Sequence, residues 1–468
     1  MDKNKSHAGL ALLAYKIGPN QFELNRSLTY ISMRDQVLRA RTLIHTAIDA
    51  GLFEKQAENS SSFADGDVDY DVVVLGAGVG GISAALASAE AGMRTLVLDA
   101  QGQCFSLLRK GTDRLLSTTV YDWPAIHFSS HCFPDIPDLK PNPATHAAIL
   151  RFPSAPKAAS ALADELQAQL DKYKLKYSSV FQIENGIKLT SHQSVLYGGA
   201  RVLTVILPRE INVLGGSKSS IIRARIVIFA IGFGSEKVLA SSSDIGKTFW
   251  GYASLEKELD ALRPERATAV VQGAGDGGLQ ECLRIAFKPE YHDLAKAISL
   301  LEREVSDVSP EWYQLMLKIL CAEDNAARAY MWGYDIPTVY KGLDEVHDSV
   351  IVRLLEPETK GAVLEWYRQV VREREIHIFV VDKHAHSGRV YALNRFLVKL
   401  LLTLTKRNLV TRVSVELTGG APTGPADIGP IDRSGIDQDD GPQGTASKED
   451  LLRHAVFGAI PNQYGVVR

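Results

Sequence analysis

The sequence predicts an α/β protein with two domains, the second of which is partly helical. The main observation is a buried-strand pattern that leads into a glycine-rich turn and occurs twice, at residues 71–81 and 270–278. The other observation is a mainly helical pattern over residues 279–375. Strands that alternate with helices are typical of parallel sheets covered by helices.

The composition argues against several classes of protein. The 52 Lys and Arg residues nearly balance the 55 Asp and Glu residues, so no overall field attracts a nucleic acid or an anionic membrane. The four cysteines form no C-x-x-C pair, and no uncharged apolar run approaches the length of about eighteen residues that a membrane span needs. We therefore expect a cytoplasmic protein with a small-molecule substrate and no nucleic-acid or membrane partner. Whether it forms a homo-oligomer is left open.

The first glycine-rich turn carries the strongest signal. It lies in the run Asp71-Val-Val-Val-Leu-Gly76-Ala77-Gly78-Val-Gly80-Gly81. Gly76 permits a tight turn, Gly78 lets the backbone approach a pyrophosphate, and Gly81 lets the following helix pack closely on the strand. The start of that helix presents N–H groups and its positive dipole end to the phosphates.

A second strand is predicted at residues 95–98, with Asp99 at its tip and Ala100 next to it. A carboxylate at this position accepts hydrogen bonds from an adenosine ribose and repels a 2′-phosphate, which disfavours NADP at this site. We therefore predict that residues 68–100 bind a dinucleotide. A glycine turn with a merely structural use is the alternative.

Three phrases follow the first turn: Val180-Phe-Gln-Ile-Glu184, Ala224-Arg-Ile-Val-Ile-Phe-Ala230-Ile231-Gly232 and Val270-Val-Gln-Gly273-Ala-Gly275-Asp276-Gly-Gly278. In this order, over roughly residues 69–284, the chain resembles the flavoprotein superfamily with two dinucleotide-binding domains. That superfamily includes flavin monooxygenases, N-hydroxylating monooxygenases and thioredoxin-reductase-like enzymes. The resemblance implies a Rossmann-type FAD-binding domain in which the backbone of Val180 meets the adenine and residues 230–232 pass near FAD. Ile231 departs from the family, which usually has Thr there, and Val180 as an ordinary strand residue is the alternative.

The second glycine-rich turn, with Gly273, Gly275 and Gly278, is suited to a nicotinamide dinucleotide, NADH or NADPH. One feature weakens this interpretation, because Asp276 places a carboxylate inside the turn, where it would repel a phosphate. The alternative is a degenerate copy of the unit, kept as scaffold and interrupted by a helical insertion.

The strand that should follow the second turn is also poorly marked. Residues 297–301 are the only candidate, and they fit a helix equally well. If they form a strand, Glu302 or Arg303 would meet the ribose, and the choice between NAD and NADP is unreadable from the sequence.

An aromatic stretch at residues 119–132 offers candidates for chemistry beside the flavin, namely Tyr121, Trp123 and His127. Aromatic side chains there would wall a flavin or substrate, and His127 would transfer protons near neutral pH. Ordinary loop packing is the favoured alternative. We reject a metal site, because His127, His131 and Cys132 have no fourth ligand nearby.

Two further leads lie outside these motifs. Arg109 follows the first unit and would contact the pyrophosphate, although a solvated loop fits equally well. Asp382, His384 and His386 follow a predicted strand, at the end where open α/β sheets place ligands. The redox C-x-x-C, the F-x-G-x-x-x-H stretch and the late Gly-Asp phrase of better-known subfamilies are missing.

The expected domain organisation has four parts. Residues 1–66 form a helical N-terminal extension and linker, and residues 67–245 form the first part of the FAD-binding domain. Residues 246–375 form a second Rossmann-like domain with a helical insertion. Residues 376–468 return to the FAD-binding domain and end in a flexible tail.

The leading hypothesis is an FAD-dependent oxidoreductase that NADH or NADPH reduces, either a monooxygenase or a reductase of a small organic substrate. The first alternative is an FAD-dependent oxidase or dehydrogenase without nicotinamide. The second is a non-catalytic dinucleotide-binding sensor or interaction protein.

Overall fold

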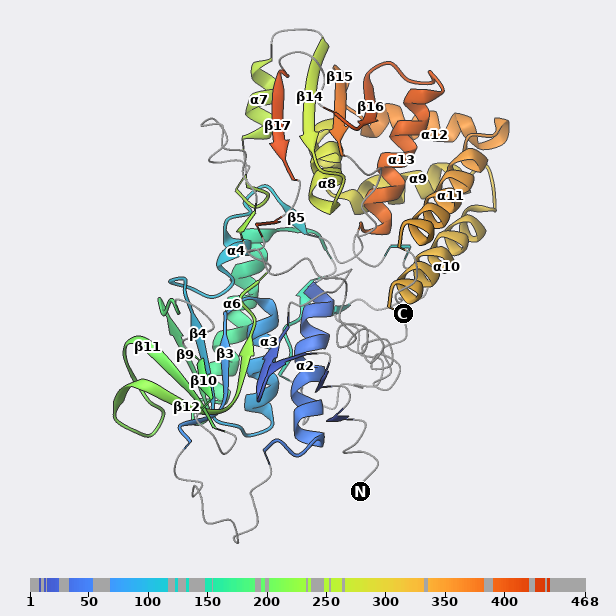
Figure 1. The fold of residues 1–468 in the computed structure, drawn as a ribbon. Helices are drawn as coiled ribbons and strands as arrows, with labels where there is room; N and C mark the ends of the chain where they lie inside the picture. Colours follow the sequence, from blue (N-terminus) through green and yellow to red (C-terminus); the bar gives the residue numbers. More distant parts are fainter. Residues whose placement is uncertain are drawn as a thin grey trace.

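The computed structural model shows two α/β domains, each built on its own sheet (Figure 1), so the predicted fold class is confirmed. The structure describes residues 8–9, 12–13, 15–24, 33–53, 68–116, 123–124, 132–133, 148–153, 155–189, 195–197, 202–232, 235–236, 248–251, 254–262, 266–331, 336–382, 390–420, 426–433 and 436–437.

The first sheet is built around β3 (Tyr70–Leu75), which is almost entirely buried. Its strand order is β1-β2-β12-β3-β4-β9, and the strands from β2 to β9 run parallel. Cover on both faces explains why residues 72–75 of β3 are a continuous apolar run. The other strands of this sheet are β4 (Thr95–Asp99), β9 (Phe181–Asn185), β10 (Val195–Tyr197), β11 (Leu203–Asn212) and β12 (Lys218–Phe229).

Helices α2 (Met33–Asp49), α3 (Val79–Glu90) and α6 (Ala159–Lys176) share one apolar core with this sheet. In α3 every residue except Glu90 is buried, and Gly, Ala and Ser make up most of the helix. Such small side chains let the helix axis approach the sheet closely. The short helix α4 (Ser106–Arg109) follows β4 and packs against α6.

The N-terminal segment belongs to the first domain. The strands β1 (Lys16–Gly18) and β2 (Gln21–Glu23) extend the sheet, because β2 pairs in parallel with β12. Val37, Leu43 and Ile44 of α2 are fully buried in the same core. The prediction of a separate extension over residues 1–66 is corrected, because these apolar side chains complete the first domain.

The second sheet has four parallel strands in the order β16-β15-β14-β17. They are β14 (Arg266–Gln272), β15 (Glu375–Val381), β16 (Val413–Thr418) and β17 (Ile428–Asp432). Helix α8 (Asp276–Ala286) follows β14, and α13 (Ala392–Lys406) connects β15 to β16. Residues 376–433, where described, therefore complete the second domain. The expected return to the first domain is wrong for them.

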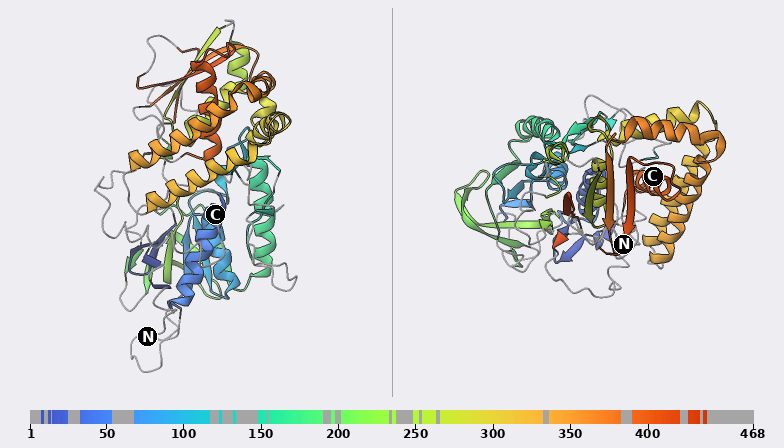
Figure 2. Two further views of the ribbon diagram at one scale, coloured as in Figure 1. Left: turned by 90° about the vertical axis from the view of Figure 1, so that its right-hand side faces the viewer. Right: turned by 90° about the horizontal axis from the view of Figure 1, so that it is seen from above.

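A helical insertion separates α8 from β15. It contains α9 (Leu294–Ser306), α10 (Trp312–Met331), α11 (Ile336–Leu354) and α12 (Pro357–Val370), and α10 and α11 lie side by side (Figure 2). Residues 297–301 lie in α9, so the strand considered there is wrong. Because the buried residues Ala297, Ile298 and Leu301 recur at helical spacing, their apolar pattern belongs to one face of α9.

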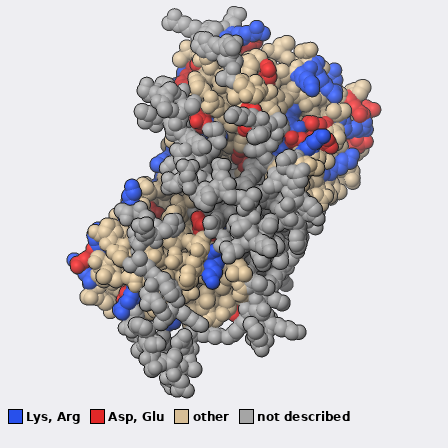
Figure 3. All heavy atoms as spheres, in the orientation of Figure 1, with Lys and Arg blue, Asp and Glu red and all other residues tan. Residues whose placement is uncertain are grey.

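The remaining described elements are short. They are α7 (Leu255–Ala261), the 3₁₀ turn η4 (Pro289–Tyr291), and the strand pairs β5 (Leu115–Leu116) with β8 (Lys157–Ala158), β6 (Cys132–Phe133) with β7 (Phe152–Pro153), and β13 (Ser235–Glu236) with β18 (Ile436–Asp437). Among the helices that the structure describes, none combines the length and apolarity that crossing a bilayer requires. Acidic and basic side chains are interspersed on the second domain in the view of Figure 3.

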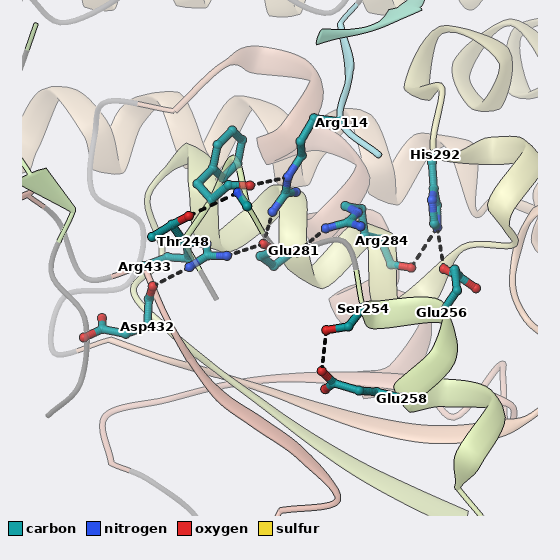
Figure 4. Close-up of polar contacts among 12 residues, drawn as sticks. Arg114, Thr248, Ser254, Glu256, Glu258, Glu281, Arg284, His292, Asp432 and Arg433 are labelled. Carbon is teal, nitrogen blue, oxygen red and sulfur yellow. Dashed lines mark hydrogen bonds and ion pairs between the residues drawn. The ribbon is translucent and has the colours of Figure 1, made fainter. Parts of the chain in front are cut away.

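A buried cluster of charges joins the two domains at Glu281 of α8, which has no exposed surface (Figure 4). Arg114 of the first domain and Arg433 beyond β17 both pair with Oε1, Arg433 at 2.6 Å, and Arg284 pairs with Oε2 at 3.1 Å. Nε of Arg114 donates to the carbonyl of Phe249 at 2.5 Å. The same guanidinium lies 4.1 Å from the centre of the Phe249 ring.

The charges in this cluster are mutually dependent. Burial by itself would raise the pKa of Glu281, but Arg114, Arg433 and Arg284 lower it to about 2. Burial lowers the pKa of Arg114 to about 10, although Glu281 opposes the change. Both groups are therefore charged at neutral pH, and a desolvated ion pair ties the first domain to α8.

We predict that Glu281→Gln destabilises the protein by about 3–5 kcal/mol, because it leaves buried guanidinium groups without their counter-ion. Denaturant unfolding followed by tryptophan fluorescence measures the effect. The control is Glu365→Gln, since Glu365 pairs with Arg368 on the exposed side of α12 and is expected to matter by about 1 kcal/mol or less. Equal unfolding midpoints for Glu281→Gln and the unmodified protein would contradict the prediction.

Candidate functional site

The first glycine-rich turn joins β3 to α3 at the carboxyl edge of the first sheet. Gly76 has a φ of +107°, and the carbonyl of Ala230 fills the space that a Cβ at Gly76 would need. A Cβ on Gly81 would collide with the carbonyl oxygen of Gly76. Glycine at these two positions therefore allows β3, β12 and α3 to pack against one another.

Gly78 has a different role, because, among the residues that the structure describes, no atom beyond its own turn lies within 4 Å of the place where its Cβ would stand. Its φ of −75° suits any residue, so the turn itself does not require glycine there. Gly78 is also the N-cap of α3, and as a glycine it has no side chain to cap this helix. Bare backbone at the start of a helix fits the pyrophosphate of a dinucleotide.

The tip acid of the first unit is bound to the glycine turn. The backbone N–H of Ala77 donates to Oδ2 of Asp99 at 2.5 Å, and the N–H of Gln101 donates to Oδ1 at 2.7 Å. An ionised carboxylate has about four acceptor positions, so these two bonds leave room for ribose hydroxyls. Ala100 follows as an exposed residue. Asp99 therefore lies where it could accept hydrogen bonds from a ribose, and that contact stays a prediction.

Gly80, Ala230 and Gly232 lie around the same turn. Leu24 and Gln36 of the N-terminal segment lie 3.5 and 3.7 Å from the place of a Cβ on Gly80. The N–H of Ala230 donates to Leu75, at the end of β3, at 2.8 Å. Gly232 follows with a φ of +83°. The structure thus brings the last phrase of β12 next to the glycine turn, as the resemblance implies.

Two residues that were expected to contact the cofactor, Val180 and Arg109, lie away from the glycine turn. Val180 precedes β9, which runs parallel to β4 with Thr95 opposite Phe181, so Val180 is at the amino end of the strand. Its carbonyl accepts from Thr95 and its N–H donates to Tyr177. The strand separates Val180 from the carboxyl edge by about 15 Å, which corrects the expected adenine contact.

Arg109 is likewise engaged away from the turn. Its Nη1 pairs with Asp164 of α6 at 2.5 Å, and its Nε donates to the carbonyl of Cys104 at 3.2 Å. These bonds brace α4 against α6. Because its guanidinium binds Asp164 and Cys104, Arg109 is not a freely solvated side chain, and it does not point to the expected pyrophosphate position.

Trp123 lies in the apolar core of the second domain, and its ring centre is 5.0 Å from that of Phe396 on α13. This position favours the packing interpretation and joins the two domains a second time. Tyr121 and His127 lie outside the described residues. Within the described part of the chain, no three His, Cys, Asp or Glu side chains gather as a metal site.

The second turn repeats the backbone geometry of the first. Gly273 has a φ of +97°, and a Cβ on Gly278 would collide with the carbonyl oxygen of Gly273. Gly275 is the N-cap of α8 in an extended conformation, as Gly78 is for α3, and neither glycine has a side chain to cap its helix. The N–H of Gly273 donates to Val381, at the end of β15, at 2.8 Å.

A tip acid that sequence reasoning did not connect to this turn completes the second unit. The N–H of Ala274 donates to Oδ2 of Asp382 at 2.8 Å, as Ala77 donates to Asp99. The two residues are 108 positions apart here and only 22 apart in the first unit. Glu302 and Arg303 both lie in α9 rather than at the tip of a strand. The ribose contact that was expected from one of them is therefore wrong.

The carboxylate of Asp276 is bound at the start of α13. Its Oδ1 accepts from the N–H of Tyr391 at 2.7 Å and from Nδ2 of Asn394 at 3.0 Å, both at the start of α13. Burial raises the pKa of Asp276 to about 7, although these two hydrogen bonds oppose the rise. The expected repulsion of a phosphate is therefore corrected, because this side chain caps α13.

Asp276→Asn is predicted to stabilise the protein more at pH 8 than at pH 5. Asn keeps the Oδ1 acceptor and both hydrogen bonds but does not ionise. The folded pKa lies above the ordinary value of 3.8, so the stability that protonated Asp276 contributes is complete below about pH 4 and is lost as the pH rises through 7. Melting temperatures of both proteins between pH 5 and 8.5 measure the effect, and a difference that does not change with pH would contradict it.

Comparison with known proteins agrees with the first turn. Residues 71–108 match the family model of the FAD binding domain. No curated protein sequence matches the chain.

Solved structures show only distant likeness. Thioredoxin reductase from T. acidophilum is 16% identical with a TM-score of 0.26, over 46% of this chain and 52% of that chain. A flavin monooxygenase from Stenotrophomonas maltophilia is 21% identical with a TM-score of 0.28, over 46% of this chain and 54% of that one. The protein of the OTEMO complex with FAD and NADP is 14% identical with a TM-score of 0.34, over 79% and 71%. The alignment spans about half the length of the first two proteins.

TM-scores below 0.5 establish no shared overall arrangement, so these likenesses carry no argument about this chain. The match over residues 71–108 shows an FAD binding domain at the first glycine turn, and the structure shows a second α/β domain with a similar turn.

Proposed function

We propose that the chain is an FAD-dependent oxidoreductase that a nicotinamide dinucleotide reduces and that acts on a small organic substrate. The observation that carries the proposal is the repeated unit: a G-A-G turn, a helix whose N-cap is glycine and a strand-tip Asp are present in each domain. FAD supplies redox chemistry, and the chain binds and orients it. Monooxygenase and reductase remain two forms of this proposal.

The residues of the first domain have distinct tasks in the proposed FAD site. Backbone N–H groups at the start of α3 bind the pyrophosphate beside Gly78. The carboxylate of Asp99, held by Ala77, accepts from the ribose hydroxyls. Residues 230–232 line the approach to the flavin from the end of β12.

The second site supports the nicotinamide form of the proposal over an oxidase that uses FAD alone. Two features of the sequence favoured the oxidase: the carboxylate of Asp276 and the lack of a clear second strand. Asp276 instead caps α13, and β15 is the strand in question. Both objections to nicotinamide binding are thereby removed.

The relation of the two turns to the domain junction gives further support. The N–H of Phe105 donates to the carbonyl of Ala77 in the first turn at 3.0 Å, and Arg114 follows on the same stretch of chain. Arg114 pairs with Glu281 of α8, whose first turn contains Gly277. Arg433 lies 3.4 Å from the place of a Cβ on Gly277. The second turn thus lies at the junction, and residues 105–114 link the first turn to it, an arrangement suited to transfer between two bound dinucleotides.

Anaerobic titration of the purified protein tests the proposal. We expect protein with flavin absorbance that NADH or NADPH bleaches. Gly275→Val is expected to keep the flavin and to lose the bleaching, because a side chain at Gly275 covers the N-terminal backbone of α8. Bleaching by an organic substrate and never by nicotinamide would favour the FAD-only oxidase, and bound flavin that no reductant bleaches would favour the non-catalytic alternative.

Gly78→Val tests the FAD site itself. We expect FAD binding to weaken at least about 100-fold, because the side chain separates the pyrophosphate from backbone donors whose hydrogen bonds to a charged group are worth about 1.5–3 kcal/mol each. The fold should be retained, since no described residue outside the turn lies within 4 Å of the added Cβ. Gly361→Val in α12, whose Cβ likewise meets no atom of the described residues within 4 Å beyond its own helix backbone, is the control and should keep its flavin. A yellow Gly78→Val protein would argue against the site.

A further inference from the structure

Asp382 occupies in the second domain the place that Asp99 occupies in the first. Each carboxylate lies at the end of the strand that follows its glycine turn. Each accepts, through Oδ2, the N–H of the alanine between the first two glycines, at 2.5 Å for Asp99 and 2.8 Å for Asp382. The same backbone donor thus fixes an acid beside each turn.

The strand register makes this correspondence specific. β14 pairs with β15 over its whole length, with Gln272 opposite Val381, as Leu75 pairs opposite Leu98 in the first sheet. Asp382 therefore stands one residue beyond the paired strand end, next to the turn. A dinucleotide whose phosphates lie at the start of α8 brings its adenosine ribose to such a strand tip.

We propose that Asp382 makes the second site select NADH over NADPH, an inference that rests on the proposed function. A carboxylate accepts hydrogen bonds from the 2′- and 3′-hydroxyls of an unphosphorylated ribose. A 2′-phosphate carries up to about two negative charges near pH 7 and is repelled at this distance. Because Ala274 holds one carboxylate oxygen, the acid cannot swing away from the turn without losing a hydrogen bond.

Binding of the oxidised dinucleotides tests the selection without any turnover. NAD⁺ and NADP⁺ are titrated separately into the full-length protein as purified, and the dissociation constants are measured by calorimetry. We expect NAD⁺ to bind at least about tenfold more tightly than NADP⁺. The ratio should shrink as the salt concentration rises, because like-charge repulsion is screened.

Asp382→Asn is the decisive variant, because Asn retains an oxygen acceptor for the N–H of Ala274 but carries no charge. We expect the ratio to fall at least about fivefold, mainly through tighter NADP⁺ binding. Asp427→Asn is the matched control. Asp427 also accepts a backbone N–H, from Thr268 at 2.7 Å, but it lies at the amino end of the same sheet. Its loss of charge should leave the ratio unchanged.

The outcomes separate this inference from the proposed function. Tighter binding of NADP⁺ to the unmodified protein, or an unchanged ratio in Asp382→Asn, overturns the selection by Asp382 and leaves the nicotinamide step standing. If neither dinucleotide binds at millimolar concentration, the nicotinamide step is overturned and the selection with it.

Discussion

Close backbone packing at the two glycine turns positions the strands, helices and acids of both domains. The carbonyl oxygens of Gly76 and Gly273 lie where a Cβ on Gly81 or Gly278 would stand, so each helix starts directly against its strand. A larger residue at Gly81 or Gly278 would push the helix away from its strand. The backbone N–H groups at the start of the helix would then no longer be aligned with the turn. The strand-tip acids Asp99 and Asp382 accept a backbone N–H from the two turns. These hydrogen bonds fix the position of each acid relative to its turn.

The junction between the domains depends on electrostatics of a different kind. Burying Glu281 with its guanidinium partners contributes little net stability compared with an apolar contact, because desolvation offsets much of the attraction. Such a cluster nevertheless disfavours any other arrangement, since a shifted domain would leave desolvated charges without partners. Trp123 adds an apolar contact with Phe396 to the same junction. The relative position of the two glycine turns is therefore maintained by few but specific contacts.

Helix α13 connects the second turn with the inserted helices. Its start is capped by Asp276, and further along it Arg395 and Lys399 pair with Asp344 and Asp348 of α11 at 2.8 and 2.7 Å. Both pairs have the same four-residue spacing on each helix, which brings them onto facing sides. The inserted helices are thus attached to the second sheet through charged as well as apolar contacts of α13. Because α13 also binds Asp276, a displacement of α13 would act directly on the second turn.

Local pattern was enough to predict the first unit, because β3, its turn, α3 and Asp99 follow one another within a short stretch of chain. The sequence also indicated the strand before Asp382, which is β15, as an isolated element. The pairing of β15 with β14 could be seen only in the fold, since it spans the helical insertion and no local signal records it. The same holds for the partners of Asp276, the sheet end at which Val180 lies, and the domains to which residues 15–53 and residues 413–433, where described, belong. Each of these features depends on contacts between residues far apart in the sequence. Such contacts form through burial of apolar side chains and through strand pairing, which local sequence patterns do not specify.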